Sequence, residues 1–222
     1  MQRSPGVASD AYAISKHKTV AIIIAGGRSQ RMGGGDKTLR FLAGRPMISH
    51  VWTIIAPQVS QLVLNVNGPS ERFTTVLPGI QILQDARTNN GPLEGVLVGL
   101  CWAEKIGATR LLTVPGDTPF LPHDLVAHLF SAISISKATV ACTRSAGHLH
   151  PLISIWDLTL TSALKTFLAT GNRAAKDFLF LNQLKIVDFS ATPLDPFMNL
   201  NTLADLEAAE QIAQHFQSLR ER

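Results

Sequence analysis

The sequence predicts an α/β protein in which helices cover both faces of a mostly parallel, twisted sheet, giving three layers. Short apolar segments rich in β-branched residues alternate with segments of helical periodicity through the first two thirds of the chain. The 222 residues, 45% of them hydrophobic, suit a single core. The first apolar segment also leads directly into a glycine-rich loop. We expect one domain over residues 19–222, preceded by a flexible tail of residues 1–18.

The first element, Val20–Ala25, is predicted to be a strand buried on both faces, because it is a continuous apolar run too short to span a membrane. The glycines of the following loop, residues 26–35, permit positive φ and let backbone N–H groups approach a ligand. Arg28, Arg31 and Lys37 add cationic groups that pair with phosphate oxygens. The combination predicts a polyphosphate site, with a plain surface turn as the alternative.

Two common phosphate motifs do not fit this loop. The P-loop requires Gly-Lys-Ser/Thr in succession, but Asp36 separates Gly35 from Lys37. The dinucleotide fingerprint G-x-G-x-x-G, started at Gly33, would need a glycine where Thr38 stands. The loop therefore belongs to neither class.

The segments that follow alternate between helical and extended patterns. Pro46 introduces a helix that runs to Ile55, since proline suits the first helical position. Residues 61–67 and 80–84 are predicted as short buried strands that end on polar residues. In a parallel sheet, polar residues at strand ends line the ligand crevice.

Strong turn residues at Asn89–Pro92 precede a predicted helix, Leu93–Lys105, whose glycines at 95 and 99 allow close packing on the sheet. Alternating apolar patterns continue to the end of the chain. They predict helices at 121–134, 158–169, 174–181 and 203–219, and strands at 110–114, 138–143, 152–156 and 184–189.

Asp117 follows the predicted strand at 110–114, in a segment crowded with proline and glycine. Its carboxylate is therefore expected at the carboxyl end of a central strand. Together with Asp85 it could hold Mg²⁺, which favours one or two carboxylates completed by water and substrate phosphates. The alternative is that Asp117 caps a turn or a helix.

His150 and a pair of asparagines are further candidates for substrate binding. His150 is expected to face the crevice. With its neighbouring histidine and Cys142 it forms part of a zinc pattern, but no complete ligand spacing supports zinc. Asn199 and Asn201 bracket one residue, so an extended backbone would point both amides to the same side. Alternatively, they satisfy backbone groups before the last helix, which Thr202 would cap.

Composition narrows the possible partners. The net charge is +4 and the pI about 9.3, yet no block of like charges occurs and only 6% of residues are aromatic. A site for small polyanions is therefore expected and nucleic acid is not. Cys101 and Cys142 lie far apart in apolar segments and are expected to be reduced. No signal-peptide or transmembrane pattern is present, so we expect a cytoplasmic monomer without a membrane partner.

The loop pattern A-G-G-x-x-x-R-M-G-G-x-D-K, from Ala25 to Lys37, closely resembles the signature of the molybdenum cofactor guanylyltransferases, a branch of the nucleotidyltransferases. The resemblance implies the Rossmann-like nucleotidyltransferase fold, with Mg²⁺ as cofactor. It continues in order almost to the end of the chain, at Gly44–Pro46, Asn65–Asn67, Gly91–Leu93, Gly116–Pro119, His150–Pro151 and Asn199–Thr202.

The resemblance also implies roles for individual residues. GTP contacts would fall on Ile24, Ala25, Gly26, Gly27, Lys37, Asn65, Asp85 and Asp117. The molybdopterin side would be formed by His150, Asn199 and Asn201. Asp117 would bind Mg²⁺, and the transfer step would depend on Lys37, Asp117 and Arg31. Three residues depart from the usual pattern of the family. Ile24 stands where leucine is usual, Glu94 stands where a small residue is usual, and Leu203 stands where proline is usual. Of these, Glu94 is expected to weaken activity by placing negative charge near a polyanion site.

The reaction implied is attack by the terminal phosphate of Mo-molybdopterin on the α-phosphorus of GTP, releasing pyrophosphate. A phosphate monoester with a second pKa of about 6 is already anionic at neutral pH, so no general base is needed. No Ser-His-Asp or Cys-His arrangement is expected either. Beyond the two substrates, molybdenum insertion proteins and apo-molybdoenzymes are the implied partners.

Several alternatives stay open: a cytidylyltransferase for the same cofactor, a sugar-phosphate nucleotidyltransferase, and a non-enzymatic module that binds and delivers molybdopterin or nucleotide. Guanine presents the donors N1–H and N2–H₂, which suit an acceptor such as the Asp85 carboxylate, whereas cytosine would favour donors. The double glycine at 26 and 27 and the segment Gly91–Leu93 resemble the guanine branch.

Overall fold

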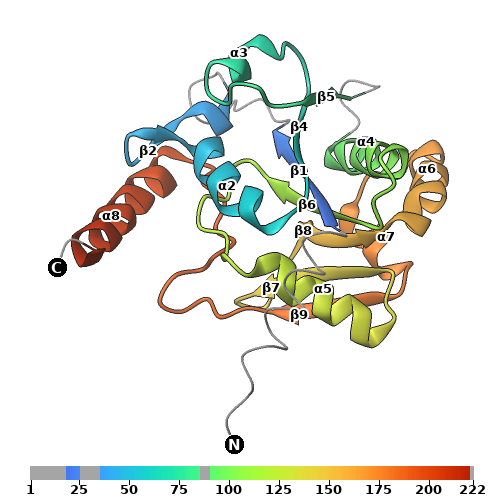
Figure 1. The fold of residues 1–222 in the computed structure, drawn as a ribbon. Coiled ribbons are helices and arrows are strands. Elements are labelled where there is room, and N and C mark those ends of the chain that lie inside the picture. The colour runs from blue at the N-terminus through green and yellow to red at the C-terminus, as the bar shows by residue number, and fades with distance from the viewer. Residues whose placement is uncertain (1–18, 26–35, 86–90, 221–222) are drawn as a thin grey trace, which may run out of the picture.

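The computed structural model describes residues 19–25, 36–85 and 91–220 (Figure 1). The expected tail, residues 1–18, and the glycine loop, residues 26–35, lie outside these ranges. No helix in the described part of the chain is long and apolar enough to cross a membrane.

Within the described residues the main sheet has seven strands, and the antiparallel strand β8 interrupts an otherwise parallel arrangement. β8 pairs antiparallel with both of its neighbours, whereas the other adjacent strands run parallel. The mostly parallel sheet predicted from the sequence is confirmed. In spatial order the strands are β5 (Ile82–Gln84), β4 (Leu62–Val66), β1 (Thr19–Ala25), β6 (Arg110–Pro115), β8 (His148–Asp157), β7 (Val140–Ser145) and β9 (Leu184–Asp188).

Helices cover both faces of the sheet, because β1 is apolar on both (Figure 1). Ala21 and Ile23 face one core, with α2 (Met47–Ile55) and α5 (Leu125–Ser136). Val20, Ile22 and Ile24 face a second core against the helices of the opposite layer. These are α4 (Pro92–Lys105), α6 (Thr161–Ala169) and α7 (Ala175–Phe180).

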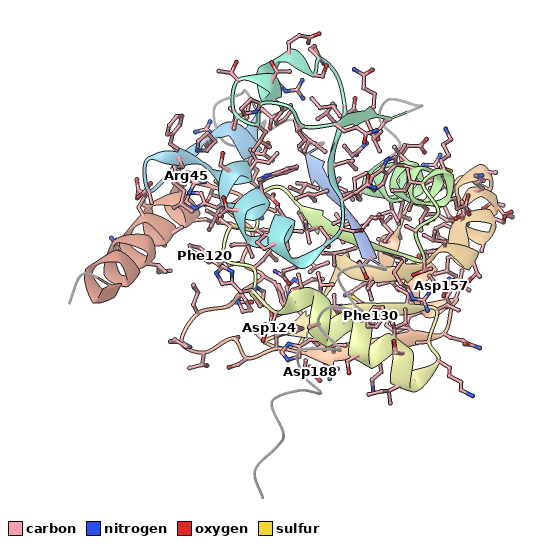
Figure 2. The ribbon with its side chains drawn as sticks, in the orientation of Figure 1. Arg45, Phe120, Asp124, Phe130, Asp157 and Asp188 are labelled. Carbon is pink, nitrogen blue, oxygen red and sulfur yellow. The ribbon has the colours of Figure 1, made fainter. Side chains whose placement is uncertain are left out.

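Ion pairs reinforce the half of the sheet around β8. Arg110, at the start of β6, forms a 2.6 Å ion pair with Asp157 at the end of β8. Figure 2 labels Asp157 and, farther along this half of the molecule, Asp188 of β9. Arg144 of β7 donates hydrogen bonds of 2.6 and 2.8 Å to the two oxygens of Asp188 in β9. The second contact is exposed, so we assign it little stabilising energy.

Strand register brings the carboxyl ends of β5, β4, β1 and β6 to one edge of the sheet. Ile24 pairs with Asn65 on one side and with Pro115 on the other. Asn65 in turn pairs with Leu83. Residues that follow these four strands therefore line a common edge, as the sequence predicted.

Local features shift some expected boundaries. α5 begins at Leu125 instead of 121, because Pro122 disfavours the helical conformation of the residue before it. β8 begins at His148, four residues earlier than expected, and joins β7 through a two-residue turn in which both residues have positive φ. Besides one-turn 3-10 helices at Lys37–Leu39 and Ala56–Gln58, three short elements were not predicted: β2 (Phe41–Leu42), β3 (Arg45–Pro46) and α3 (Glu71–Thr74).

The last helix and the cap expected at Thr202 are confirmed. α8 spans Leu203–Arg220, and Thr202 Oγ1 accepts a hydrogen bond from Asp205 N at 3.1 Å. A third, smaller apolar cluster lies between this helix and the β2–α2 region. It contains Leu42, Met47, Leu200 and Ala209.

We expect Gly99→Ala to lower the free energy of unfolding by about 1–2 kcal/mol, because overpacking outweighs the better helix propensity of alanine. A Cβ at this position would lie 2.8 Å from Leu111 Cδ2 and 2.9 Å from Ile22 Cγ2. Urea unfolding measures the change. Glu104→Ala, at an exposed position of the same helix, is the control and should stay within about 0.5 kcal/mol of the wild type. A Gly99→Ala protein as stable as the wild type would contradict the close packing of α4.

Candidate functional site

A one-turn 3-10 helix, Lys37–Leu39, carries Lys37 to the sheet edge. The Asp36 carboxylate caps this turn, accepting hydrogen bonds from Thr38 N at 3.1 Å and from Thr38 Oγ1 at 2.7 Å. Its other oxygen accepts a hydrogen bond from Arg72 Nε at 2.8 Å. The residue that breaks the P-loop pattern therefore fixes the backbone of Lys37.

The Lys37 ammonium group joins two of the other predicted site residues. It forms a 2.5 Å ion pair with the Asp117 carboxylate, and the two side chains are only 12% and 18% exposed. It also donates a hydrogen bond to Asn201 Oδ1. Three segments far apart in sequence thus meet at one cation, and we call Lys37, Asp117 and Asn201 the transfer group.

Backbone and capping contacts hold Asn201 in place. Asp205 Oδ2 accepts hydrogen bonds of 2.8 Å from the backbone N–H groups of Asn201 and Thr202. Desolvation acts against the charged form of Asp205, but these hydrogen bonds and the nearby Lys37 outweigh it, so the pKa of Asp205 lies below its ordinary value. In addition, Leu200 N donates to the Asp117 carbonyl oxygen at 3.2 Å.

The two asparagines occupy different environments. The side chain of Asn201 meets Lys37, whereas Asn199 is exposed and its side chain forms no hydrogen bond with the described residues. Of the alternative interpretation, the Thr202 cap is confirmed, but Asp205 and not the asparagines satisfies the backbone N–H groups at the start of α8. Substrate contact and capping are therefore compatible in one segment.

A second group forms around Asn65, at the carboxyl end of β4. Asn65 is 1% exposed, and its Nδ2 donates to Asp85 Oδ1 at 2.7 Å and to the Leu83 carbonyl at 3.3 Å. Burial raises the pKa of Asp85 above its ordinary value; the hydrogen bond from Asn65 opposes this shift and the charge of Glu94 adds to it. A Cβ at position 95 would lie 2.4 Å from Asn65 Oδ1, so glycine there lets α4 pack directly on the amide.

The other residues predicted to contact GTP are placed only in part. Ile24 and Ala25 end β1, between the two groups, and are 7% and 1% exposed. Such contacts would therefore come from backbone atoms. Gly26, Gly27 and Arg31 lie outside the described residues.

His150 belongs to a polar chain that we did not expect. Its Nε2 lies 2.7 Å from Ser145 Oγ, which donates to Asp195 Oδ1 at 2.7 Å. The ring packs on Phe197 with centroids 5.0 Å apart. Burial lowers the pKa of His150; Asp195 opposes the shift and His148 adds to it.

We expected no Ser-His-Asp arrangement, but these contacts bring a serine, a histidine and an aspartate together. The serine nevertheless stands in the middle and donates to the aspartate, whereas nucleophilic activation requires the serine to give its proton to the histidine. These hydrogen bonds therefore orient the His150 ring but do not activate Ser145 as a nucleophile. Ser145 and Asp195 are 50 residues apart, and no local pattern connects them.

Cysteine chemistry does not contribute to this region. Both cysteines are free, as expected, and burial raises the pKa of Cys142 to about 11. No group of three or more His, Cys, Asp or Glu side chains in the described ranges has the arrangement of a metal site. Zinc binding by Cys142 and the two histidines has no support.

Asp85 and Asp117 are not brought together for a shared Mg²⁺. Each carboxylate has its own partner, Asn65 and Lys37 respectively. Asp85 follows β5 and Asp117 follows β6, with β4 and β1 between them. Three strand spacings of about 4.8 Å amount to about 14 Å.

This separation suits a nucleoside triphosphate lying along the sheet edge. A polar, partly anionic group around Asn65 lies at one end, and the Lys37 ammonium lies at the other. A base with hydrogen-bond donors fits the first end, and phosphates fit the second. Both groups lie at the carboxyl ends of parallel strands, which is where open α/β sheets bind their ligands. The fold and the site together define a nucleotidyltransferase.

Comparison with known proteins identifies the family. The model of the MobA-like NTP transferase domain matches residues 21–186. A molybdenum cofactor guanylyltransferase of Bradyrhizobium sp. (strain ORS 278) is 40% identical over 199 residues, covering 86% of this chain and 92% of the relative. The chain therefore belongs to the MobA-like NTP transferases, within the family of molybdenum cofactor guanylyltransferases.

Solved structures confirm the predicted fold class. Molybdopterin-guanine dinucleotide biosynthesis protein A of Archaeoglobus fulgidus superposes with a TM-score of 0.69 at 20% identity, covering 89% of this chain and 99% of that one. A Mycobacterium tuberculosis protein solved as a complex with manganese superposes with a TM-score of 0.64 at 13% sequence identity. The match covers 87% of this chain and 98% of that one. At these identities the likeness concerns the fold.

The lowered pKa of His150 predicts a pH-dependent loss of stability. The pKa of an unfolded histidine is about 6.5. Because the pKa of His150 in the folded protein is lower, the unfolded chain binds more protons at this site as the pH falls below that value. Stability should therefore fall as the pH drops through this window. Melting temperatures between about pH 7.5 and 5.5 should decline less steeply for His150→Gln than for the wild type. His123→Gln, at an exposed position, is the control. Equal slopes for His150→Gln and the wild type would refute the assignment.

Proposed function

We propose that this protein transfers the GMP moiety of GTP to the terminal phosphate of molybdopterin, forming molybdopterin guanine dinucleotide and releasing pyrophosphate. The observation that carries the proposal is the transfer group, in which Lys37 meets Asp117 and Asn201 at the sheet edge. GTP would lie with its base toward Asn65 and Asp85 and its phosphates toward Lys37. Membership of the guanylyltransferase family supports this orientation and this reaction.

The chemistry requires positioning and charge neutralisation more than proton transfer. The acceptor phosphate is already an anion at neutral pH, so it attacks the α-phosphorus without a general base. Lys37 neutralises charge that builds on the phosphates, and its partial burial strengthens that effect. The capped turn that Lys37 begins keeps the ammonium group in one place, and such positioning is the larger part of catalysis in phosphoryl-type transfers.

Asp117 would hold Mg²⁺. The Asp117 carboxylate and Asn201 Oδ1 already converge on one cation, the Lys37 ammonium group, so oxygen donors suited to a hard metal ion are present. Bound Mg²⁺ supplies positive charge to the phosphates and the leaving pyrophosphate. The manganese complex of a protein with the same fold supports a divalent ion.

The molybdopterin side would be formed by Asn199, Asn201 and His150. Asn199 is exposed and its side chain makes no hydrogen bond with the described residues, so it is available to an acceptor. Asn201 already contacts Lys37, at the point where donor and acceptor phosphates must meet. His150 is held in one orientation by Ser145. Molybdenum insertion proteins and apo-molybdoenzymes would be the partners before and after the reaction.

Pyrophosphate release in the presence of molybdopterin tests the proposal directly. We expect release with GTP and little with CTP or ATP. Release with CTP instead would identify a cytidylyltransferase, and release only with sugar phosphates a different acceptor class. Binding of GTP and molybdopterin without pyrophosphate release would point to a delivery module.

Lys37→Ala should weaken GTP affinity and turnover together. A charged hydrogen bond at this position is worth roughly 1.5–3 kcal/mol, or about ten- to hundredfold in affinity. Equilibrium binding and steady-state pyrophosphate release measure the two effects. Lys165→Ala, at an exposed position on α6, should change neither. Wild-type GTP affinity and rate in Lys37→Ala would refute the phosphate role.

Asp117→Asn should preserve folding and lower turnover by about two to three orders of magnitude, because it keeps the size of the side chain and removes its charge. Titration calorimetry should also show weaker Mg²⁺ binding in the presence of GTP. If Asp117 served only as a turn cap, Asp117→Ala would lower the free energy of unfolding by about 1 kcal/mol. Asp117→Asn would then change neither stability nor turnover by much. Near wild-type turnover of Asp117→Asn at limiting Mg²⁺ would exclude the metal role.

A further inference from the structure

Glu94 is a buried residue whose carboxylate has no hydrogen-bond or ion-pair partner among the described residues. It is the third residue of α4 and only 6% exposed. Burying a charged group without a partner is costly, and the positive end of the helix dipole offsets only part of that cost. A bound ligand that donates hydrogen bonds would account for such a group.

The Glu94 carboxylate belongs with Asn65 and Asp85. Its charge contributes to raising the pKa of Asp85, so the two carboxylates interact electrostatically. The next residue, Gly95, places α4 directly on the Asn65 amide. Asn65 in turn donates to Asp85 at 2.7 Å. We call these three side chains, from β4, the end of β5 and the start of α4, the base-end group.

Guanine matches two neighbouring carboxylates better than any other common base does. One carboxylate can accept N1–H and one N2–H side by side. The second hydrogen of the 2-amino group then needs another acceptor. A base that presents an acceptor at the same edge, such as adenine or cytosine, would instead meet negative charge. Sites built to receive a particular N–H reject analogues that lack it, because buried polar groups are then left unpaired.

We propose that Glu94 is a specificity-determining residue that accepts a hydrogen bond from the 2-amino group of guanine, beside Asp85. This inference rests on the proposed function. It assigns a role to a residue that departs from the pattern of the family, in which a small side chain is usual. We expected Glu94 to weaken activity by adding negative charge near a polyanion site. Its charge acts on Asp85, whereas Lys37 pairs with Asp117.

Inosine triphosphate provides the test, because it differs from GTP only in lacking the 2-amino group. Dissociation constants for both nucleotides, measured with Mg²⁺, cancel every contribution of the triphosphate. The wild type should prefer GTP roughly ten- to hundredfold. Glu94→Ala should lower this ratio severalfold by weakening GTP binding while leaving inosine triphosphate unchanged, and the preference that remains reflects the hydrogen bond of the 2-amino group to Asp85. Glu94→Gln keeps an acceptor oxygen and should give an intermediate ratio.

Glu104→Gln, at an exposed position on the same helix, is the matched control and should keep the wild-type ratio. Melting temperatures verify that each variant folds, and Glu94→Gln decides the question if Glu94→Ala does not fold. A wild-type ratio in the folded Glu94 variants would overturn the inference and leave the proposed function intact. Equal tightening of both nucleotides would also overturn it, since Glu94 would then act on phosphate charge. A wild type that binds neither nucleotide would overturn the proposed function itself.

Discussion

The common direction of β5, β4, β1 and β6 is the constraint on which the rest of this structure depends. Because the four strands are parallel and in register, residues that follow them in sequence arrive at one edge. Parallel strands must be connected by crossovers, and the helices in those crossovers bury both faces of the sheet. The edge itself is then the one place where polar side chains from several strands can meet a ligand.

Charge is distributed unevenly along that edge. The end near β6 holds a lysine whose partners are a carboxylate and an amide, while the end near β5 holds two carboxylates and an amide. A guanine nucleotide has the complementary polarity, with donors on its base and negative charge on its phosphates. Under the proposed function, this charge distribution would favour one orientation of GTP before any shape complementarity is considered.

Much of this arrangement could be predicted from the sequence, because it follows from local patterns. Apolar runs such as Val20–Ala25 predict buried strands, and polar residues near strand ends, such as Asn65 within β4 and Asp117 shortly after β6, predict the ligand-binding edge. The contact of Ser145 with Asp195 could not be predicted in this way, because it joins residues 50 positions apart with no periodic signal. The β2–β3 hairpin could not be predicted for another reason. Its strands have two residues each, which is too short to show an alternating pattern.

The contact between Lys37 and Asn201 spans 164 residues of chain, whereas Asn65 and Asp85 are only 20 apart. During synthesis from the N-terminus, the strands that form the base end emerge long before the segment that completes the transfer end. Closing so long a loop also carries a larger entropic cost than closing a short one. The two ends of the site are therefore assembled at different times, and a ribosome-bound chain can acquire the elements for recognising a nucleotide well before it can react with one.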